Sequence, residues 1–487
     1  MKTRAFMLMG TGSDVGKSLV AAGLCRAFAN RGLKVMPFKP QNMSNNAAVT
    51  FDGGEIGRAQ ALQARAARQP ATVHMNPVLL KPETNTGAQV IVQGKRTATM
   101  TARDFFKSRQ QFMPAIVESF QKLSKQADLI IVEGAGSPAE VNLRHGDLAN
   151  MGFAKAVGIP AFLVGDIHRG GVIASIVGTL AVLDPEDQAR LKGFIINKFH
   201  GDVKLFEDGK IYLEAATKLS CLGIIPHFAN ARNLPAEDAV ALEDILVTDS
   251  KNYKISVLKL PRIANFDDLD PLRLEPGVSV RFLDLGQPIP GDTNLVIIPG
   301  SKSTMADFTA LRTAGWDIDL KAHVRRGGRV LGLCGGYQML GKMIHDPQGL
   351  EGPMGSVKGL GLLNVETTLL QDKTLTRVKA THLASGQEIE GYEIHLGSSC
   401  GTDCARPFAR IGNHDDGATS ADGLVSGTYI HGCFASDRFR STYLKTLGAQ
   451  SSNLAFETLL EKTLDELAAH LEQHLNLDQV LELAGEI

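Results

Sequence analysis

The 487-residue chain has little net charge, few aromatic side chains and few cysteines. Its 51 lysines and arginines nearly balance 52 aspartates and glutamates. The composition therefore gives no excess of positive charge that would favour binding to nucleic acid or to an anionic membrane. We therefore expect small-molecule partners, no nucleic acid and no membrane, and the composition leaves the oligomeric state open. A chain of this length predicts two or three domains, each large enough for its own core.

Long apolar runs are also missing. The longest largely apolar stretch, residues 172–183, falls far short of the roughly 20 residues needed to cross a bilayer. The first apolar patch, residues 5–9, is short and leads into a glycine turn, so we expect no signal peptide. Six cysteines are too few for a disulfide scaffold, and a reactive thiol needs a reducing compartment. These features predict a cytoplasmic protein.

Glycine is abundant, and one glycine turn organises the second half of the chain. Fifty glycines suit an α/β protein with many tight turns between strands and helices. A buried-type strand over residues 330–333 ends at Cys334, and Gly335 and Gly336 follow before a helical pattern begins. This order is typical of a nucleophile elbow, with the helix N-terminus favouring a thiolate. From the turn alone, a buried structural cysteine is the alternative interpretation.

Two distant segments support the catalytic interpretation. Residues 428–434 read TYIHGCF, a β-rich run that ends in His431, and a cysteine nucleophile needs a histidine close in space but often remote in sequence. Residues 294–301 read NLVIIPGS, a buried strand that ends in a turn at Gly300. Such a turn is suited to donating backbone N–H groups to an oxyanion.

The PG turn, the GxCGG elbow and the late histidine together resemble the class I glutamine amidotransferases. The resemblance implies that Cys334 attacks the carboxamide of glutamine, and that His431 moves the proton. It also implies that N–H groups near Gly300 and Gly335 hold the oxyanion. The glutamate that usually follows the histidine by two positions is replaced by Cys433. The resemblance therefore favours the subgroup of that family with a Cys–His dyad.

The N-terminal segment predicts a nucleotide site. A strand over residues 5–9 is followed by GTGSDVGKS at 10–18 and a helical pattern to residue 30. Loop N–H groups and a helix N-terminus face an anion in such a unit, the lysine reaches the outer phosphates and the serine binds Mg²⁺. An ordinary glycine-rich turn is the alternative. The predicted ATP contacts are Gly10, Thr11, Gly12, Val15, Gly16, Lys17 and Ser18.

The spacing of this loop departs from the common phosphate-binding pattern, because Thr11 stands where that pattern has glycine. The GTxxxxGKS arrangement resembles the dethiobiotin synthetase branch of P-loop proteins, which implies phosphorylation of a carboxylate or carbamate. Further along, a strand over residues 193–196 leads into Asn197, which resembles the base-recognition position of P-loop proteins.

Metal and substrate candidates lie after other predicted strands. A strand over 128–132 ends at Glu133, a carboxylate suited to bind Mg²⁺ together with Ser18. Asp52 is a second candidate ligand, or it caps the helix that follows. The polar loop KPQNMSNN after a strand over 32–38 lies at the sheet edge where ligands bind. The substrate candidates are Lys39, Asn42 and Ser44 in this loop and Lys81 in a later polar stretch.

The alternation of strands and helices predicts an α/β fold with a mostly parallel sheet covered by helices, followed by an α/β amidotransferase domain. We expect an ATP-dependent amidoligase domain over 1–250, the class I amidotransferase domain over 251–447 and a helical segment over 448–487. Residues 227–253 read as a helix and linker, and the amphipathic tail is expected to pack against the body.

The order of synthetase first and amidotransferase second resembles the cobyrinic acid and cobyric acid synthase family. Segments such as KPQNMSNN, EGAGSPAEVNL, LPAED and GYEIHLG, spread over nearly the whole chain, resemble the members that amidate adenosylcobyrinic acid a,c-diamide. The resemblance implies that ATP and Mg²⁺ are the cofactors and that glutamine is the nitrogen donor. It implies amidation of the b, d, e and g carboxylates of this corrinoid through acyl phosphates, with ammonia released at Cys334.

Two alternatives remain from the sequence. The first is the sister enzyme, which amidates the a and c carboxylates. Spacing arguments do not distinguish it from the enzyme that amidates the a,c-diamide. A P-loop ATPase scaffold with an inactive amidotransferase domain is the second, and the presence of both Cys334 and His431 argues against it.

Overall fold

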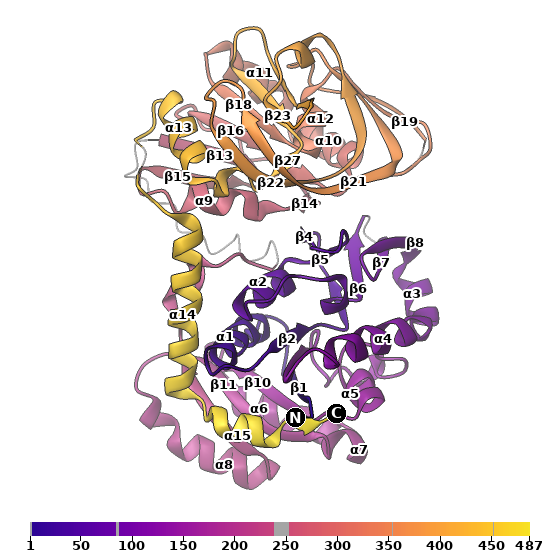
Figure 1. The fold of residues 1–487 in the computed structure, drawn as a ribbon, viewed down its shortest axis with the longest axis vertical. Coiled ribbons are helices and arrows are strands. Elements are labelled where there is room, and N and C mark those ends of the chain that lie inside the picture. The colour runs from indigo at the N-terminus through magenta and orange to yellow at the C-terminus, as the bar shows by residue number, and fades with distance from the viewer. Residues whose placement is uncertain (1, 84–86, 238–252, 353, 451) are drawn as a thin grey trace. The chain divides into compact units, whose positions relative to one another are not determined.

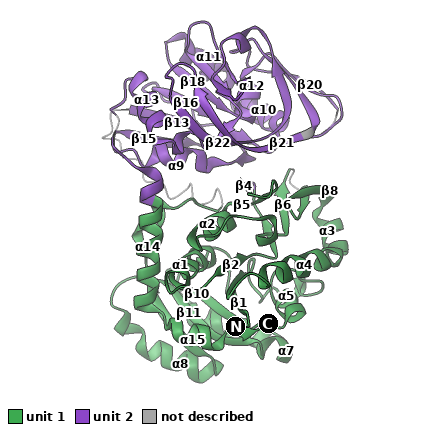
Figure 2. Cartoon of the chain, viewed as in Figure 1, with its two compact units in different colours: residues 1–44, 50–237, 460–487 green, residues 45–49, 238–459 purple. Residues whose placement is uncertain are grey.

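The computed structural model describes residues 2–83, 87–237, 253–352, 354–450 and 452–487. The chain forms two compact units (Figure 2). Unit 1 comprises Met1–Ser44, Thr50–Glu237 and Leu460–Ile487, and unit 2 comprises Asn45–Val49 and Asp238–Leu459. The domain boundary expected near residue 250, and most of the helix and linker expected over 227–253, lie outside the described residues. Among the described helices, none combines the length and the apolar character that a membrane span requires.

Unit 1 is built on a six-stranded parallel sheet in the order β12-β11-β10-β1-β9-β2, as the sequence predicts. The strands consist largely of buried apolar residues, because helices cover both faces of a parallel sheet. The strands are β1 (Arg4–Gly10), β2 (Val35–Phe38), β9 (Leu129–Glu133), β10 (Ala161–Asp166), β11 (Leu191–Phe199) and β12 (Ser220–Pro226).

Helices connect these strands and contribute to the core of unit 1 (Figure 1). They are α1 (Lys17–Asn30), α2 (Arg58–Ala66), α3 (Ala102–Ser108), α4 (Met113–Ser124), α5 (Met151–Val157), α6 (Val172–Val182), α7 (Pro185–Gln188) and α8 (Glu207–Thr217). A smaller sheet, in the order β3-β6-β7-β8, stands beside them. Its strands are β3 (Gln41–Met43), β6 (Val78–Pro82), β7 (Gly87–Val92) and β8 (Lys95–Thr101), and β5 (Glu55–Gly57) also belongs to unit 1.

The C-terminal tail packs on unit 1, as its amphipathic pattern predicts. The residues of helix α14 (Phe456–His474) from Leu460 onward belong to this unit, as do α15 (Leu477–Leu483) and β28 (Gly485–Glu486). Side chains of α14 press so closely on α1 that a Cβ added at Gly23 would lie 2.5 Å from Leu471. Strand β28 pairs antiparallel with β1, which brings the two ends of the chain together (Figure 1).

Unit 2 contains a second mainly parallel sheet, in the order β15-β13-β16-β18-β26-β25, with only β25 antiparallel. Its strands are β13 (Tyr253–Leu258), β15 (Val278–Leu283), β16 (Leu295–Ile298), β18 (Arg329–Leu333), β25 (Ala418–Thr419) and β26 (Val425–Thr428). The helices of this unit are α9 (Asp270–Arg273), α10 (Thr304–Thr313), α11 (Trp316–Arg325), α12 (Gly335–Leu340) and α13 (Asp437–Thr446).

A separate antiparallel layer in unit 2 is centred on the long hairpin β21 (Glu366–His382) and β22 (Glu388–Cys400). The layer also holds β19 (Met343–Asp346), β20 (Gly355–Lys358), β23 (Ala409–Ile411), β24 (His414–Asp416) and β27 (Ile430–His431). The short strands β14 (Ile263–Ala264) and β17 (Gly300–Ser301) pair with each other, and β4 (Ala47–Val49) completes the unit.

Candidate active sites

The predicted elbow is present between β18 and α12 in unit 2. Cys334 adopts φ +50° and ψ −110°, a strained conformation that turns its side chain out of the strand-to-helix path. The turn requires glycine on steric grounds, since a Cβ added at Gly336 would lie 2.0 Å from the carbonyl oxygen of Ile298. The Cys334 N–H donates to the Thr428 carbonyl at 2.8 Å. The thiol, 9 % exposed, lies 3.6 Å from the Ile394 carbonyl.

His431 lies beside this cysteine. It forms a side-chain hydrogen bond with Cys334, and its Nδ1 atom lies 2.6 Å from a carboxylate oxygen of Asp268. Burial alone would lower the pKa of His431, but the Asp268 carboxylate and the Cys334 sulfur raise it to about 10. Because Asp268 occupies Nδ1, the other ring nitrogen is left to face the sulfur. The geometry can therefore hold an imidazolium beside the Cys334 sulfur.

Asp268 is the residue that sequence reasoning missed. The expectation of a Cys–His dyad is incomplete, because this carboxylate contacts His431 from a position 163 residues earlier in the chain. Its second oxygen accepts the Gly432 N–H at 2.7 Å, so the carboxylate fixes both the ring and the turn after it. Cys433, at the position of the usual glutamate, is buried in the hydrophobic core instead. The segment FDDLDPL offered three aspartates, and no spacing rule selects one of them.

The Gly300 turn and Gly335 come together next to these side chains. A Cβ added at Gly300 would lie 3.3 Å from Cε1 of His431, and one added at Gly335 would lie 3.0 Å from the backbone nitrogen of Ser301. Buried Asp307 holds the turn in place, since it accepts the Ser301 hydroxyl at 2.7 Å and the Arg262 N–H at 3.0 Å. The backbone nitrogen of Ser301 therefore lies close to Gly335, the residue that follows Cys334.

The predicted phosphate loop lies between β1 and α1 in unit 1. Lys17 is buried, and its ammonium donates to the carbonyl oxygens of Gly12 and Gly136, each at 3.1 Å. Burial lowers the pKa of Lys17. Asn197, at the end of β11, donates its amide to the Val15 carbonyl at 2.8 Å and so supports the loop from behind. Gly10, Thr11 and Ser18 complete the turn, in which Gly16 has φ +92°.

Ser18 and Glu133, two of the three predicted metal ligands, are in contact. The Ser18 hydroxyl lies 2.6 Å from the carboxylate of Glu133, which is 1 % exposed at the end of β9. The third predicted ligand, Asp52, does not join them. It is exposed, it accepts hydrogen bonds from the Val73 N–H, and it is absent from the described contacts of Ser18 and Glu133.

Three of the four substrate candidates contact Glu237: Ser44 at its backbone carbonyl, and Lys39 and Asn42 at its carboxylate. The Lys39 ammonium lies 2.6 Å from it and 2.9 Å from Glu133, the Asn42 side chain bonds to it, and the Ser44 hydroxyl donates to the Glu237 carbonyl at 3.2 Å. Lys81 belongs to a different pair, with its ammonium 3.0 Å from the buried carboxylate of Glu55. Sequence reasoning assigned no role to Glu237, although its segment LPAED was noted.

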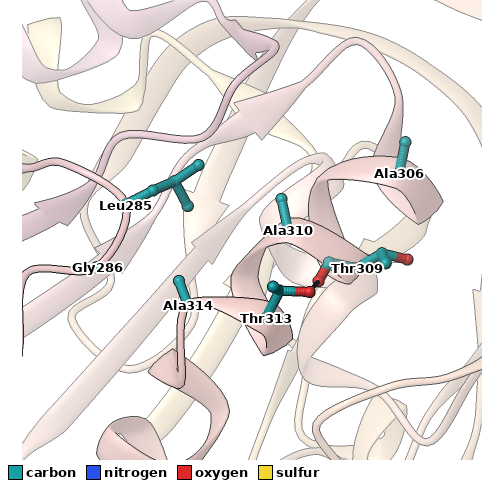
Figure 3. A pocket seen from close by; sticks show the side chains of 7 residues that line it. All are labelled: Leu285, Gly286, Ala306, Thr309, Ala310, Thr313 and Ala314. Carbon is teal, nitrogen blue, oxygen red and sulfur yellow. Dashed lines mark hydrogen bonds between the residues drawn. The ribbon is translucent and has the colours of Figure 1, made fainter.

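The shallow pocket on α10 shown in Figure 3 is lined neither by the residues around Cys334 nor by those around the phosphate loop. That pocket is formed by small side chains on one face of the helix, at Ala306, Ala310 and Ala314 among others, together with Leu285. Within the described parts of the chain, no group of three or more His, Cys, Asp or Glu side chains is placed to hold a metal ion.

The two sites define the class of protein: a P-loop nucleotide-binding unit joined to a glutamine amidotransferase unit. Residues 6–241 match the family model described as the CobQ/CobB/MinD/ParA nucleotide binding domain, and residues 254–439 match the CobB/CobQ-like glutamine amidotransferase domain. The chain is 58% identical over 480 residues to a cobyric acid synthase of Cereibacter sphaeroides, with 99% of both chains covered. It is 57% identical over 488 residues to one of Methylobacterium nodulans, with 100% of both covered.

The chain belongs to the cobyric acid synthase family. It is an enzyme, a glutamine-dependent amidating ligase that acts on a corrinoid in cobalamin biosynthesis and uses ATP and glutamine.

Proposed function

We propose that this chain amidates the b, d, e and g carboxylates of adenosylcobyrinic acid a,c-diamide to give adenosylcobyric acid. Each carboxylate is activated as an acyl phosphate at the P-loop site and then receives ammonia released at Cys334. The observation that carries the proposal is that one chain holds both a Cys334–His431–Asp268 arrangement and a phosphate loop whose lysine and serine adjoin a buried carboxylate. We assign the reaction to the cytoplasm, where a free thiol stays reduced.

In the amidotransferase half, the Cys334 sulfur attacks the side-chain carbonyl carbon of glutamine. His431 gives its proton to the departing nitrogen, so ammonia leaves and a thioester remains. Water then attacks the thioester with His431 as base, which releases glutamate and restores the thiol. Asp268 keeps the ring in the orientation and tautomer that both steps need.

The oxyanion of these steps is held by backbone N–H groups. The Lys302 N–H donates to the Arg262 carbonyl at 2.9 Å. Successive N–H groups of an antiparallel strand point to opposite sides, so the N–H of the preceding residue, Ser301, points away from β14. Ser301 therefore joins Gly335 as donor, and Gly300 supplies the space beside His431.

In the synthetase half, the loop residues bind the phosphates of ATP, and Asn197 supports the loop through its bond to the Val15 carbonyl and adjoins the base. Lys17 leaves its two carbonyl partners and reaches the outer phosphates. Ser18 and Glu133 fit Mg²⁺, because both present oxygen atoms, 2.6 Å apart, at the nucleotide-binding loop. When bound, Mg²⁺ neutralises charge that develops on the transferred phosphoryl group.

The carboxylate acceptor enters beside Lys39, Asn42 and Ser44. Lys39 and Asn42 already bind the Glu237 carboxylate, and the Ser44 hydroxyl donates to the backbone carbonyl of the same residue. Lys81 is engaged with Glu55, and we keep it as a more remote contact for a substrate that carries several carboxylates. The polar donors of these residues suit a substrate anion next to a transferable phosphate.

The test is a count of amide groups. The protein is incubated with ATP, Mg²⁺, glutamine and a panel of corrinoid acids, and the mass change of each product is measured. Four amidations of the a,c-diamide are expected. Amidation of cobyrinic acid at two positions only would favour the a,c-diamide synthase instead. ATP hydrolysis without any amidation would favour a scaffold with an inactive amidotransferase unit.

A further inference from the structure

Glu237 makes an unusual set of contacts beside the phosphate loop. The Ser18 hydroxyl lies 2.6 Å from Glu133 Oε1 and also 2.6 Å from Glu237 Oε2. A hydroxyl carries one proton, so it can donate to only one of the two carboxylates, and the other contact places two oxygen lone pairs face to face. Such a contact is stabilised when a cation lies between the oxygens.

The Lys39 ammonium supplies positive charge at this place in the structure. Its Nζ atom lies 2.9 Å from Glu133 Oε1 and 2.6 Å from Glu237 Oε1, and it is 4 % exposed. The carboxylates of Glu133 and Glu237 and the Ser18 hydroxyl therefore lie around one position, and the Lys39 ammonium occupies part of it. Mg²⁺ binds octahedral oxygen ligands at about 2.1 Å, which places neighbouring ligand oxygens roughly 3 Å apart, close to the separations seen here.

An amide next to the cluster also lacks a partner. Gln63 is fully buried, and its Nε2 atom lies 2.5 Å from Glu133 Oε2. Its Oε1 atom has no hydrogen-bond partner among the described residues. A buried carbonyl oxygen without a donor is costly, and at the edge of a carboxylate cluster it is suited to accept from a water molecule bound to a cation.

From these contacts, and resting on the proposed function, we propose that Glu237 completes the divalent cation site of the P-loop unit with Ser18 and Glu133. Asp52, expected from the sequence, has no part in it. When the cation binds, it replaces the Lys39 ammonium between the two carboxylates. Lys39 is thereby released to interact with the transferred phosphoryl group and the acceptor carboxylate.

The experiment measures Mn²⁺ binding to the full-length protein by electron paramagnetic resonance, with and without ADP. The wild-type protein is expected to bind one Mn²⁺ tightly in the presence of ADP. Glu237→Gln and Glu133→Gln should each weaken this binding by about tenfold or more, because each removes a charged ligand. Asp52→Asn is the matched control, and its affinity should stay within twofold of wild type.

Lys39→Met gives an independent readout of the exchange. Without nucleotide this variant should bind Mn²⁺ more tightly than wild type, because the two carboxylates lose their competing cation. Lys81→Met, which removes another buried lysine paired with a glutamate, should leave Mn²⁺ binding unchanged. If Glu237→Gln does not fold, as judged by its circular dichroism spectrum and thermal unfolding, the lysine pair still decides.

Three results would overturn the assignment. If Glu237→Gln binds Mn²⁺ as tightly as the wild-type protein, Glu237 is only a counter-ion of Lys39 and not a cation ligand. Unchanged affinity in Lys39→Met would show that the ammonium does not compete with the cation. In both cases ATP-dependent amidation by the wild-type protein would leave the proposed function intact. Absence of any nucleotide-dependent Mn²⁺ binding in the wild-type protein would instead contradict the P-loop assignment itself.

Discussion

His431 Nδ1 lies 2.6 Å from Asp268 Oδ2, and both side chains are 2 % exposed. A hydrogen bond to an anion is strong in such a buried site, and it fixes which ring nitrogen carries the proton. His431 is therefore positioned by a residue from a different part of unit 2 and not by a near neighbour in sequence. Cys334 faces the remaining nitrogen.

The first prediction concerns the division of labour between the two units. Cys334→Ala is expected to abolish glutamine-dependent amidation and to leave amidation with free ammonium near the wild-type rate, because the phosphate site is untouched. Product formation with each nitrogen source is the measurement. Loss of both activities in a folded variant would contradict the assignment.

The second prediction concerns Asp268. Asp268→Asn should keep the fold and lower the kcat for glutamine hydrolysis by about 10²-fold or more, because the ring can then adopt the wrong tautomer. Cys433→Ala is the control at the position of the usual glutamate, and its glutaminase activity should match wild type. Equal rates in the Asp268 variant and wild type would show that a Cys–His dyad suffices.

The third prediction is a pH dependence. The raised pKa of His431, about 10, means that the charged ring stabilises the folded state fully below its unfolded pKa of about 6.5. This contribution is lost as the pH rises from about 6.5 to 10. Asp268→Asn should therefore lower the free energy of unfolding most below pH 6.5, and its deficit relative to wild type should shrink toward pH 10. Urea unfolding at several pH values measures it, and a deficit that grows with pH would contradict the charge assignment.

The fourth prediction concerns the phosphate loop. Lys17→Ala should remove amidation from both glutamine and ammonium, because no acyl phosphate forms without the charge that reaches the outer phosphates. Glutamine hydrolysis should persist, since Cys334 and His431 belong to the other unit. The two activities are measured separately on the same preparation. Full turnover with ammonium would disprove the P-loop role.

The sequence by itself determined the elements whose chemistry is local. The phosphate loop between β1 and α1, the elbow at Cys334 and the parallel strands of unit 1 follow from apolar runs that end in glycine turns. Such features need only neighbours along the chain. For this reason the residues of both loops could be named before any tertiary contact was known.

Only the tertiary structure decided which carboxylates complete the two sites. Asp268 and Glu237 lie 163 and 219 residues from His431 and Ser18, respectively. Asp52, closer in sequence to the phosphate loop, accepts a hydrogen bond from the Val73 N–H instead. Carboxylates are common in loops, and their sequence spacing carries no information about contacts made by folding. The physical reason is that the ends of several strands and loops meet only once the sheets have assembled.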